Sequence, residues 1–345
     1  MIRKILKACC TVVALTAVIA LIEGQLIVYA FSQTRAFFNP PSGPTPQKIA
    51  SSLTASEETV VLLAAGDIAY CEAPPSLSKA IPATMNLFGE PTAFEHEKAL
   101  ANETLALAQL WPNAPVLAIG DTVYGRGTPI EYENCFEPTW GQLKPRLLPA
   151  PGNHEYGSTA AFGYFDYFGT QAGSDRKGWY ALTLHNWLIL SLNSEVDAGP
   201  GSNQGKWLSQ RLRENPDKCV LAFFHRPAYS LKDRGGREHA LALFKQLQQA
   251  GTTLVINGHN HFYERTKPLN ENGEPVPEGG TVAFTVGTGG RITDAKQQKS
   301  HTEAAVFEKT GLLKLELRDQ DYSWTYVDAV EKTSLDKGSA RCNSR

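Results

Sequence analysis

Short apolar runs that end abruptly in a polar residue recur along this chain. Continuous apolar runs at residues 60–65 and 116–119 predict strands that are buried on both faces, and each run is followed by Gly-Asp. Between them, residues 95–111 carry apolar side chains at helical spacing. Because a strand, a helix and a second strand follow one another, the pattern predicts parallel pairing of the two strands.

The second half of the chain continues with strands and helices. Residues 179–184 and 187–192, separated by His185-Asn186, predict a β-hairpin. The predicted fold class is α/β, with two mixed β-sheets packed together and flanked by helices, in one domain that covers residues 59–330. Amphipathic spacing predicts helices at 204–213 and 238–249, and apolar runs predict strands at 220–224, 254–256, 282–286, 312–317 and 322–327.

The N-terminal segment has the pattern of a targeting sequence. Arg3, Lys4 and Lys7 precede an apolar stretch that ends near residue 31. Residues 1–31 are therefore either a signal peptide, with a cleavage site at Val28-Tyr29-Ala30, or an uncleaved membrane anchor. In both cases the N-terminal cations stay on the cytoplasmic side of the membrane. We therefore expect an extracytoplasmic protein, periplasmic or secreted, which is attached to the membrane if the segment is retained.

Two further segments complete the predicted domain organisation. Residues 32–58 are rich in Pro, Ser, Thr and Gln and predict an extended linker, and residues 331–345 are predicted to be a C-terminal tail. The formal net charge is −2, with acidic and basic residues mixed along the chain. The sequence therefore has no basic stripe of the kind that binds nucleic acid.

Four cysteines lie outside the targeting segment: Cys71, Cys135, Cys219 and Cys342. Their number is even, the chain is predicted to be exported, and none has the close spacing of a zinc knuckle, so we expect disulfides. Cys71 and Cys135 should pair, because the loops after the two Gly-Asp strand ends should be neighbours. Cys219 should pair with Cys342 and hold the tail beside the strand that ends at His225.

Five polar patches follow the predicted strands, at points that converge on one edge of an open α/β sheet. Their carboxylate, amide, phenol and imidazole groups indicate metal binding. Two metal ions about 3.5–4 Å apart can hold a hydroxide and clamp the attacking and leaving oxygens of a displacement at phosphorus. The patches are Gly66-Asp67, Gly120-Asp121-Thr122-Val123-Tyr124, Gly152-Asn153-His154-Glu155, His225-Arg226-Pro227 and Gly258-His259-Asn260-His261.

This ordered set of motifs resembles the calcineurin-like metallophosphoesterases, and within them the purple acid phosphatase branch. The resemblance covers the chain from about Val60 to Asp328, and it includes the Phe-Tyr-Glu-Arg sequence at 262–265. It implies the four-layer sandwich of that family, with a dimetal site at the C-terminal ends of the strands.

The resemblance also implies a role for each site residue. Asp121 would bridge the two metals, and His154 would face the phosphate and assist the leaving group. Ala69 stands where most relatives have a metal-binding histidine. In the branch with the tyrosine, a phenolate takes the place of that imidazole and stabilises Fe(III). The implied metal pair is therefore Fe(III) with divalent Fe, Zn or Mn. The first metal would be held by Asp67, Asp121, Tyr124 and His261, and the second by Asp121, Asn153, His225 and His259.

We therefore expect a dimetal-dependent phosphoester hydrolase, an acid phosphatase-like phosphomonoesterase in which a metal-bridged hydroxide attacks the phosphorus of a small phosphoester. A phosphodiesterase or nucleotidase would use the same site and differ in its pocket loops. A membrane-anchored, non-catalytic binding protein is a third reading, although the complete ligand set argues against it. Arg265 and His239 are candidates for substrate binding, with a structural ion pair as the alternative for Arg265.

Overall fold

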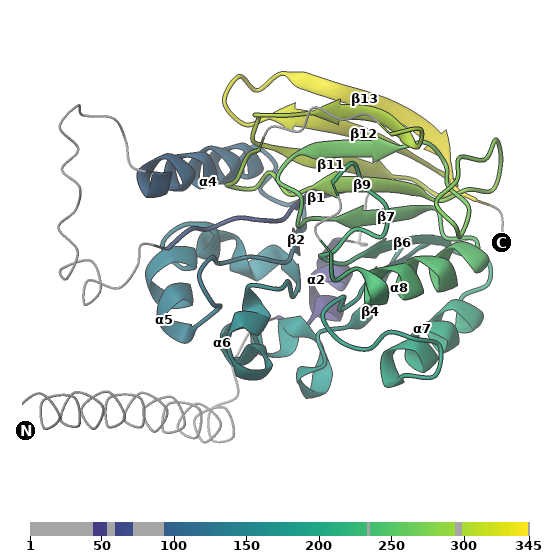
Figure 1. Ribbon diagram of the computed structural model, residues 1–345, viewed down its shortest axis with the longest axis horizontal. Coiled ribbons are helices and arrows are strands. Elements are labelled where there is room, and N and C mark those ends of the chain that lie inside the picture. The colour runs from purple at the N-terminus through teal and green to yellow at the C-terminus, as the bar shows by residue number, and fades with distance from the viewer. Residues whose placement is uncertain (1–43, 54–58, 72–92, 233–234, 294–298, 344–345) are drawn as a thin grey trace, which may run out of the picture. The chain divides into compact units, whose positions relative to one another are not determined.

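The computed structural model describes residues 44–53, 59–71, 93–232, 235–293 and 299–343 (Figure 1). The predicted signal peptide or anchor at 1–31 lies outside these residues. Within the described ranges, none of the helices combines the length and the apolar character that crossing a bilayer requires.

The first of two mixed sheets has the strand order β13-β12-β11-β1-β2-β3. The three strands β1, β2 and β3 are parallel, and β11 pairs with β1 in the antiparallel direction. The predicted parallel pairing of β1 with β2 is thus confirmed. The strands are β1 (Val60–Ala65), β2 (Val116–Ile119), β3 (Leu147–Ala150), β11 (Gly311–Leu317), β12 (Asp321–Asp328) and β13 (Ser334–Arg341).

The second sheet has the strand order β10-β8-β9-β7-β6-β5-β4. Its central strands β5, β6, β7 and β9 are parallel, and the predicted hairpin forms the antiparallel pair β4–β5. The strands are β4 (Tyr180–Leu184), β5 (Trp187–Ser191), β6 (Cys219–Phe223), β7 (Leu254–Asn257), β8 (Tyr263–Thr266), β9 (Val282–Val286) and β10 (Thr302–Val306).

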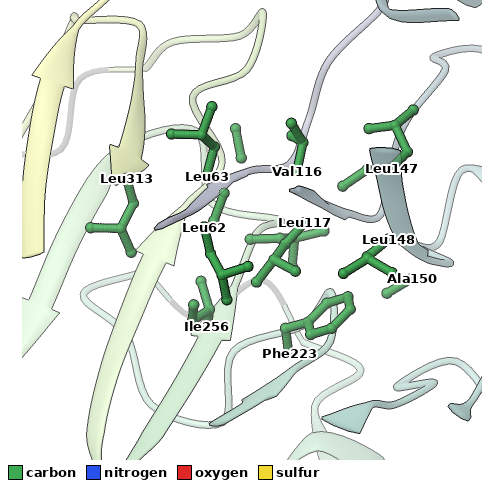
Figure 2. Close-up of a cluster of buried hydrophobic side chains, with 14 of the residues drawn as sticks. Leu62, Leu63, Val116, Leu117, Leu147, Leu148, Ala150, Phe223, Ile256 and Leu313 are labelled. Carbon is green, nitrogen blue, oxygen red and sulfur yellow. The ribbon is translucent and has the colours of Figure 1, made fainter. Parts of the chain in front are cut away.

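The hydrophobic core lies between the two sheets. Figure 2 shows Leu62 and Leu117 of the first sheet beside Phe223 and Ile256 of the second, and all four are fully buried. Helices cover the outer faces, with α4 (Ala93–Gln109) beside the first sheet and α7 (Asn203–Glu214) and α8 (Glu238–Gln249) beside the second (Figure 1). The predicted fold, two mixed sheets with helices outside, is confirmed.

Shorter helical segments fill the connection between β2 and β4. Here the chain forms α5 (Pro129–Glu131), a π-helical turn (Tyr132–Phe136) and α6 (Phe162–Phe168). Aromatic residues of these segments, among them Tyr132, Phe136 and Phe168, pack edge to face. Short 3₁₀ segments lie at Trp140–Arg146, Glu155–Gly157, Thr159–Ala161, Gly169–Ala172 and Ser174–Arg176.

The predicted linker at 32–58 is wrong where the structure has helix α2 (Pro46–Leu53). Ile49 and Ala50 of this helix are buried in the core, and Gln47 Nε2 donates to the Ala181 carbonyl of β4 at 2.9 Å. β4 ends the second sheet and would otherwise leave an open edge. The helix therefore covers an edge strand, a role that composition alone does not reveal.

The predicted C-terminal tail at 331–345 is wrong over β13, which pairs with β12 along its length. β13 is largely exposed and contains Lys337 and Gly338, so it has no apolar run to mark it as a strand. Charged and small residues are usual on edge strands, because they discourage pairing with other chains. The compact unit accordingly includes α2 and β13, which lie outside the predicted bounds of 59–330.

Both predicted disulfides are confirmed. Cys71 pairs with Cys135 and Cys219 with Cys342, with Cα atoms 5.6 Å and 5.7 Å apart. Cys219 opens β6 in the second sheet, whereas Cys342 follows β13 in the first, so this bridge links the two sheets. Disulfides persist in oxidising compartments, which indicates an extracytoplasmic protein.

Candidate metal centre

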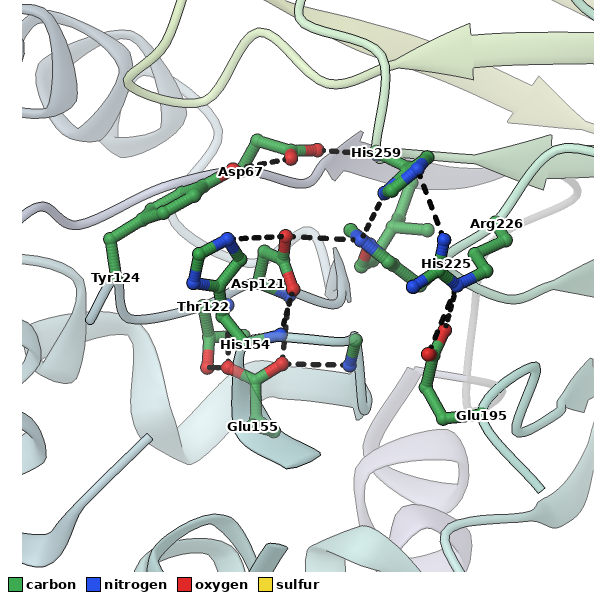
Figure 3. Close-up of polar contacts among 12 residues, drawn as sticks. Asp67, Asp121, Thr122, Tyr124, His154, Glu155, Glu195, His225, Arg226 and His259 are labelled. Atoms are coloured by element: carbon green, nitrogen blue, oxygen red, sulfur yellow. Dashed lines mark hydrogen bonds and ion pairs between the residues drawn. The ribbon is translucent and has the colours of Figure 1, made fainter. Parts of the chain in front are cut away.

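The polar patches follow the C-terminal ends of five parallel strands. Asp67 follows β1, Asp121 follows β2 and Asn153 follows β3, while His225 and His259 follow the neighbouring strands β6 and β7 of the other sheet. Figure 3 shows side chains from both sheets pointing toward one another. The cluster therefore lies where the carboxyl-terminal edges of the two sheets meet.

The backbone of these loops is held in an uncommon conformation. Asp67, Asp121 and His259 have positive φ angles of 60°, 46° and 68°. Gly120 has φ 71°, and a Cβ there would lie 2.7 Å from the His225 ring; a Cβ at Gly152 would lie 2.3 Å from Asp121 Oδ1. Such strain persists only where the surroundings impose it, and it is common at functional sites.

Asp67, Tyr124 and His261 form one group of possible metal ligands. The Tyr124 hydroxyl donates to Asp67 Oδ1 at 2.5 Å, and His261 Nε2 lies 3.1 Å from that hydroxyl and 3.3 Å from Asp67 Oδ1. The second carboxylate oxygen of Asp67 accepts a hydrogen bond from the His259 backbone N–H at 2.7 Å. One phenol, one carboxylate and one imidazole thus converge on a single point.

Asp121, His225 and His259 form the second group, and their ligand atoms all lie within 4.8 Å of one another. His225 Nε2 is 3.1 Å from Asp121 Oδ2, and His259 Nδ1 is 3.3 Å from His225 Nε2. His225 Nδ1 lies 2.9 Å from the Ile119 carbonyl, which directs Nε2 into the cluster. Metal-binding histidines are commonly oriented in this way through their other ring nitrogen.

Asn153 supplies a direct test of whether a metal fits here. Its Oδ1 atom is buried and has no hydrogen-bond partner in the part of the chain that the structure describes. A buried amide oxygen without a partner is costly, and a bound cation would satisfy it. Together with the mixed oxygen and nitrogen donors around it, this atom fits a metal centre.

The two buried carboxylates are ionised and are balanced by one histidine. Burial opposes ionisation of Asp67 and Asp121, but interactions with His261 and His225 outweigh it and lower the pKa of both. Burial likewise opposes a charge on His225, yet Asp121 raises its pKa to about 10. Burial and the charges of His225 and Arg226 lower the pKa of His259 to about 3. Two anions then face one cation, so the cluster attracts further positive charge.

His154 stands at the edge of the cluster rather than within it. Its side chain is 35% exposed, and its Nε2 is 3.9 Å from Asp121 Oδ2. Its backbone N–H donates to Asp121 Oδ1 at 2.8 Å, and Nδ1 lies 3.0 Å from the Gly125 carbonyl. The ring is therefore oriented, close to the carboxylate and open to a ligand.

Glu155 is a buried carboxylate whose role the sequence did not reveal. Its Oε2 accepts the backbone N–H groups of Asp121 and Gly152 at 2.8 and 2.7 Å, and its Oε1 accepts that of Thr122 at 2.9 Å (Figure 3). Burial and the charge of Asp121 raise its pKa. Glu155 thus ties the loop after β2 to the loop after β3. Its place in Gly-Asn-His-Glu was the only signal in the sequence.

The two candidate substrate residues do not join the cluster. Arg265 makes a two-point ion pair with Asp336 of β13, at 2.8 and 3.2 Å, and lies over the Trp324 ring. This is the structural ion pair that was the alternative for this residue. His239 lies in the first turn of α8 and is partly exposed, so its role stays a prediction.

Comparisons with known proteins agree with this geometry. The sequence profile of the calcineurin-like phosphoesterases matches residues 96–263. An uncharacterised protein of Mycobacterium tuberculosis is 30% identical over an alignment of 187 residues that covers 41% of this chain and 35% of that protein. Probable purple acid phosphatase 20 of Arabidopsis thaliana is 26% identical over an alignment of 208 residues that covers 52% of this chain and 48% of that protein.

Among solved structures, the purple acid phosphatase PPD1 of yellow lupin (Lupinus luteus) seeds superposes with a TM-score of 0.63 at 18% identity, and the match covers 82% of this chain and 54% of that one. Residues 96–263 therefore match the calcineurin-like metallophosphoesterases, and the chain is distantly homologous to purple acid phosphatases. The matches span only a third to a half of the length of these curated relatives.

Replacing Glu155 should disturb the centre without removing a ligand. In Glu155→Ala, buried N–H groups of two ligand loops lose their acceptor. We expect the free energy of unfolding to fall by about 2–4 kcal/mol, and metal affinity to fall by about 10–100-fold. Denaturant unfolding and metal titration of the purified variant measure both.

Glu131→Ala is the matched control, because the Glu131 carboxylate accepts backbone N–H groups of Arg126 and Thr128 nearby but contacts no predicted ligand. Glu131→Ala should lower the free energy of unfolding by about 1 kcal/mol, as the loss of a helix cap does, and leave metal affinity unchanged. Wild-type metal affinity in Glu155→Ala would show that Glu155 does not support the centre.

Proposed function

We propose that this protein is a two-metal phosphoester hydrolase that acts as an acid phosphatase-like phosphomonoesterase on small phosphoesters outside the cytoplasm. The observation that carries the proposal is the convergence of two donor groups, Asp67–Tyr124–His261 and Asp121–His225–His259, beside the unpartnered Asn153 oxygen. The match to the calcineurin-like phosphoesterase profile and the distant homology to purple acid phosphatases support it.

Each group would hold one metal ion. Asp67, Tyr124 and His261 would bind the first, Asn153, His225 and His259 the second, and Asp121 would bridge them as the resemblance implies. When bound, such a metal pair activates a water molecule and polarises the phosphoryl oxygens. The residues themselves would keep the two carboxylates ionised and fixed, because backbone N–H groups and the neighbouring histidines stabilise the charge on Asp67 and Asp121 against the cost of burial.

His154 is proposed to assist the leaving group. Its side chain lies half-buried at the edge of the cluster, and the Gly125 carbonyl beside Nδ1 leaves Nε2 facing the carboxylate of Asp121. A donor in this position can give a proton to the departing alcohol oxygen, which otherwise leaves as an alkoxide.

The first metal is proposed to be Fe(III), paired with divalent Fe, Zn or Mn. The support is the phenol of Tyr124, whose hydroxyl lies with Asp67 and His261 where an imidazole ligand is absent at Ala69. Burial and the neighbouring carboxylates of Asp67 and Asp121 raise the pKa of Tyr124, with Arg291, 4.4 Å from the ring, opposing them only weakly, so a bound metal would have to displace the phenol proton. A phenolate ligand of this kind suits a trivalent ion.

His154→Ala and Asp121→Asn should separate proton donation from metal binding. His154→Ala should retain both metals and lower kcat by about 10²–10⁴-fold, since that is the usual contribution of general acid catalysis. Asp121→Asn should lose metal and activity together. Elemental analysis and steady-state kinetics measure the two effects, with His96→Ala on the exposed face of α4 as a control. Loss of metal from His154→Ala would refute its role as a proton donor.

Tyr124→Phe should remove the colour of the iron-loaded protein. Apoprotein reconstituted with Fe(III) should show a visible phenolate-to-iron charge-transfer band, and Tyr124→Phe should lack it because the phenol oxygen is gone. Tyr70→Phe is the control, since its ring is 6.4 Å from that of Tyr124 and its oxygen is not a predicted ligand. A band that survives in Tyr124→Phe, or no band in the wild type, would contradict the Fe(III)–Tyr124 assignment.

A further inference from the structure

Arg226 lies directly outside the ligand cluster, one imidazole ring away from it. Its Nη1 atom is 3.2 Å from Nε2 of His259, whereas the other ring nitrogen of His259, Nδ1, faces His225 at 3.3 Å (Figure 3). The guanidinium therefore sits on the far side of a proposed metal ligand. It is placed to meet a part of the substrate that extends beyond the reacting phosphate.

The side chain of Arg226 is fixed in this place before any ligand binds. Its Nε donates to both carboxylate oxygens of Glu195, at 2.9 and 3.0 Å, and its Nη1 donates to the Gly235 carbonyl at 3.1 Å. The Arg226 and Glu195 side chains are only 16% and 8% exposed. Because the arginine is already ordered, binding an anion to it would cost little side-chain entropy.

Arg226 still has donors to offer. Its Nη2 atom makes no hydrogen bond with the described part of the chain, whereas Nε and Nη1 are both engaged. A guanidinium presents its N–H groups in a planar fork that matches the oxygens of phosphate. Nε and Nη1 hold the guanidinium in place, and Nη2 is left to donate to a ligand.

A narrow cationic pocket opens beside this arginine. Its cavity volume is about 10 Å³, the space of roughly one water molecule, and hence of one phosphate oxygen. The lining includes Arg226, Lys232, Arg237 and His259, and no carboxylate is present among the described lining residues. Such a lining selects an anionic group.

We propose that Arg226 binds a second phosphate of the substrate, so that the site favours molecules with two linked phosphate groups over simple monoesters. This rests on the proposed function. Hydrolysis would place the terminal phosphate on the cluster: the water oxygen bonds to its phosphorus, the P–O bond to the inner phosphate breaks, and the inner phosphate leaves with the electron pair and takes up the proton that the water loses. Arg226 stabilises the charge that develops on this leaving phosphate.

Two variants of Arg226 and one control test the assignment in kinetics. Arg226→Met removes the charge, Arg226→Lys keeps it without the fork, and Arg213→Met removes an arginine from the exposed face of α7. For pyrophosphate we expect Arg226→Met to lower kcat/KM by about 10–100-fold, the usual effect of losing a hydrogen bond to a charged group. For p-nitrophenyl phosphate the change should stay within about threefold, Arg226→Lys should restore part of the loss, and Arg213→Met should match the wild type.

Calorimetry supplies a readout that does not need activity. Metal-loaded wild type should bind methylenediphosphonate at least about tenfold more tightly than methylphosphonate, and Arg226→Met should bring the two affinities together by weakening only the former. Metal content is measured after each titration, because the bisphosphonate is itself a chelator.

Equal losses of kcat/KM on both substrates would place Arg226 on the reacting phosphate and overturn the proposal. Loss of metal from Arg226→Met would also overturn it, because Arg226 would then act by supporting His259. An unchanged preference in both assays would also overturn it. If the wild type hydrolyses neither substrate but the calorimetric contrast holds, then the proposed hydrolase function fails and the second-phosphate site stands.

Discussion

The structure depends on burying two carboxylates, Asp67 and Asp121, where the edges of two sheets meet. An isolated buried carboxylate is strongly disfavoured, so each needs compensation. Backbone N–H groups of His259 and His154 donate to them, and His225 supplies a positive charge. These partners come from strands of both sheets, so the site and the packing of the sheets require one another. One cation against two anions leaves a deficit, which metal ions would fill.

The scaffold around these carboxylates is rigid because several independent contacts restrain each ligand loop. Apolar strands pack between the sheets and fix the strand ends, while Glu155 holds the N–H groups of two loops on one buried carboxylate. The Cys219–Cys342 bridge links the sheets at their other margin. Positive φ angles at Asp67, Asp121 and His259 then persist because the surrounding structure holds them. A site that must position two ions needs such precision more than it needs flexibility.

The sequence was informative where one local signal sufficed. Buried apolar runs marked β1, β2, β6 and β7, and helical spacing placed α8 at its observed bounds. The polar residues after those strands were the ones that the fold brings together. The sequence did not predict features that depend on partners far away in the chain. Helix α2 and strand β13 form against the edges of the sheets, and Arg265 pairs with Asp336 of the other sheet. Glu155 and Arg226 lay inside recognised motifs, but their roles depend on N–H groups and a carboxylate that only the fold brings near.

The central claim is that Asp121 joins two metal sites in one centre. A crystal structure of the metal-loaded protein, with anomalous diffraction measured at the absorption edges of the bound metals, tests it most directly. We expect two ions about 3.5–4 Å apart, one beside Asp67, Tyr124 and His261 and the other beside Asn153, His225 and His259, with the Asp121 carboxylate touching both. A single ion, or two ions with Asp121 bound to only one of them, would contradict it.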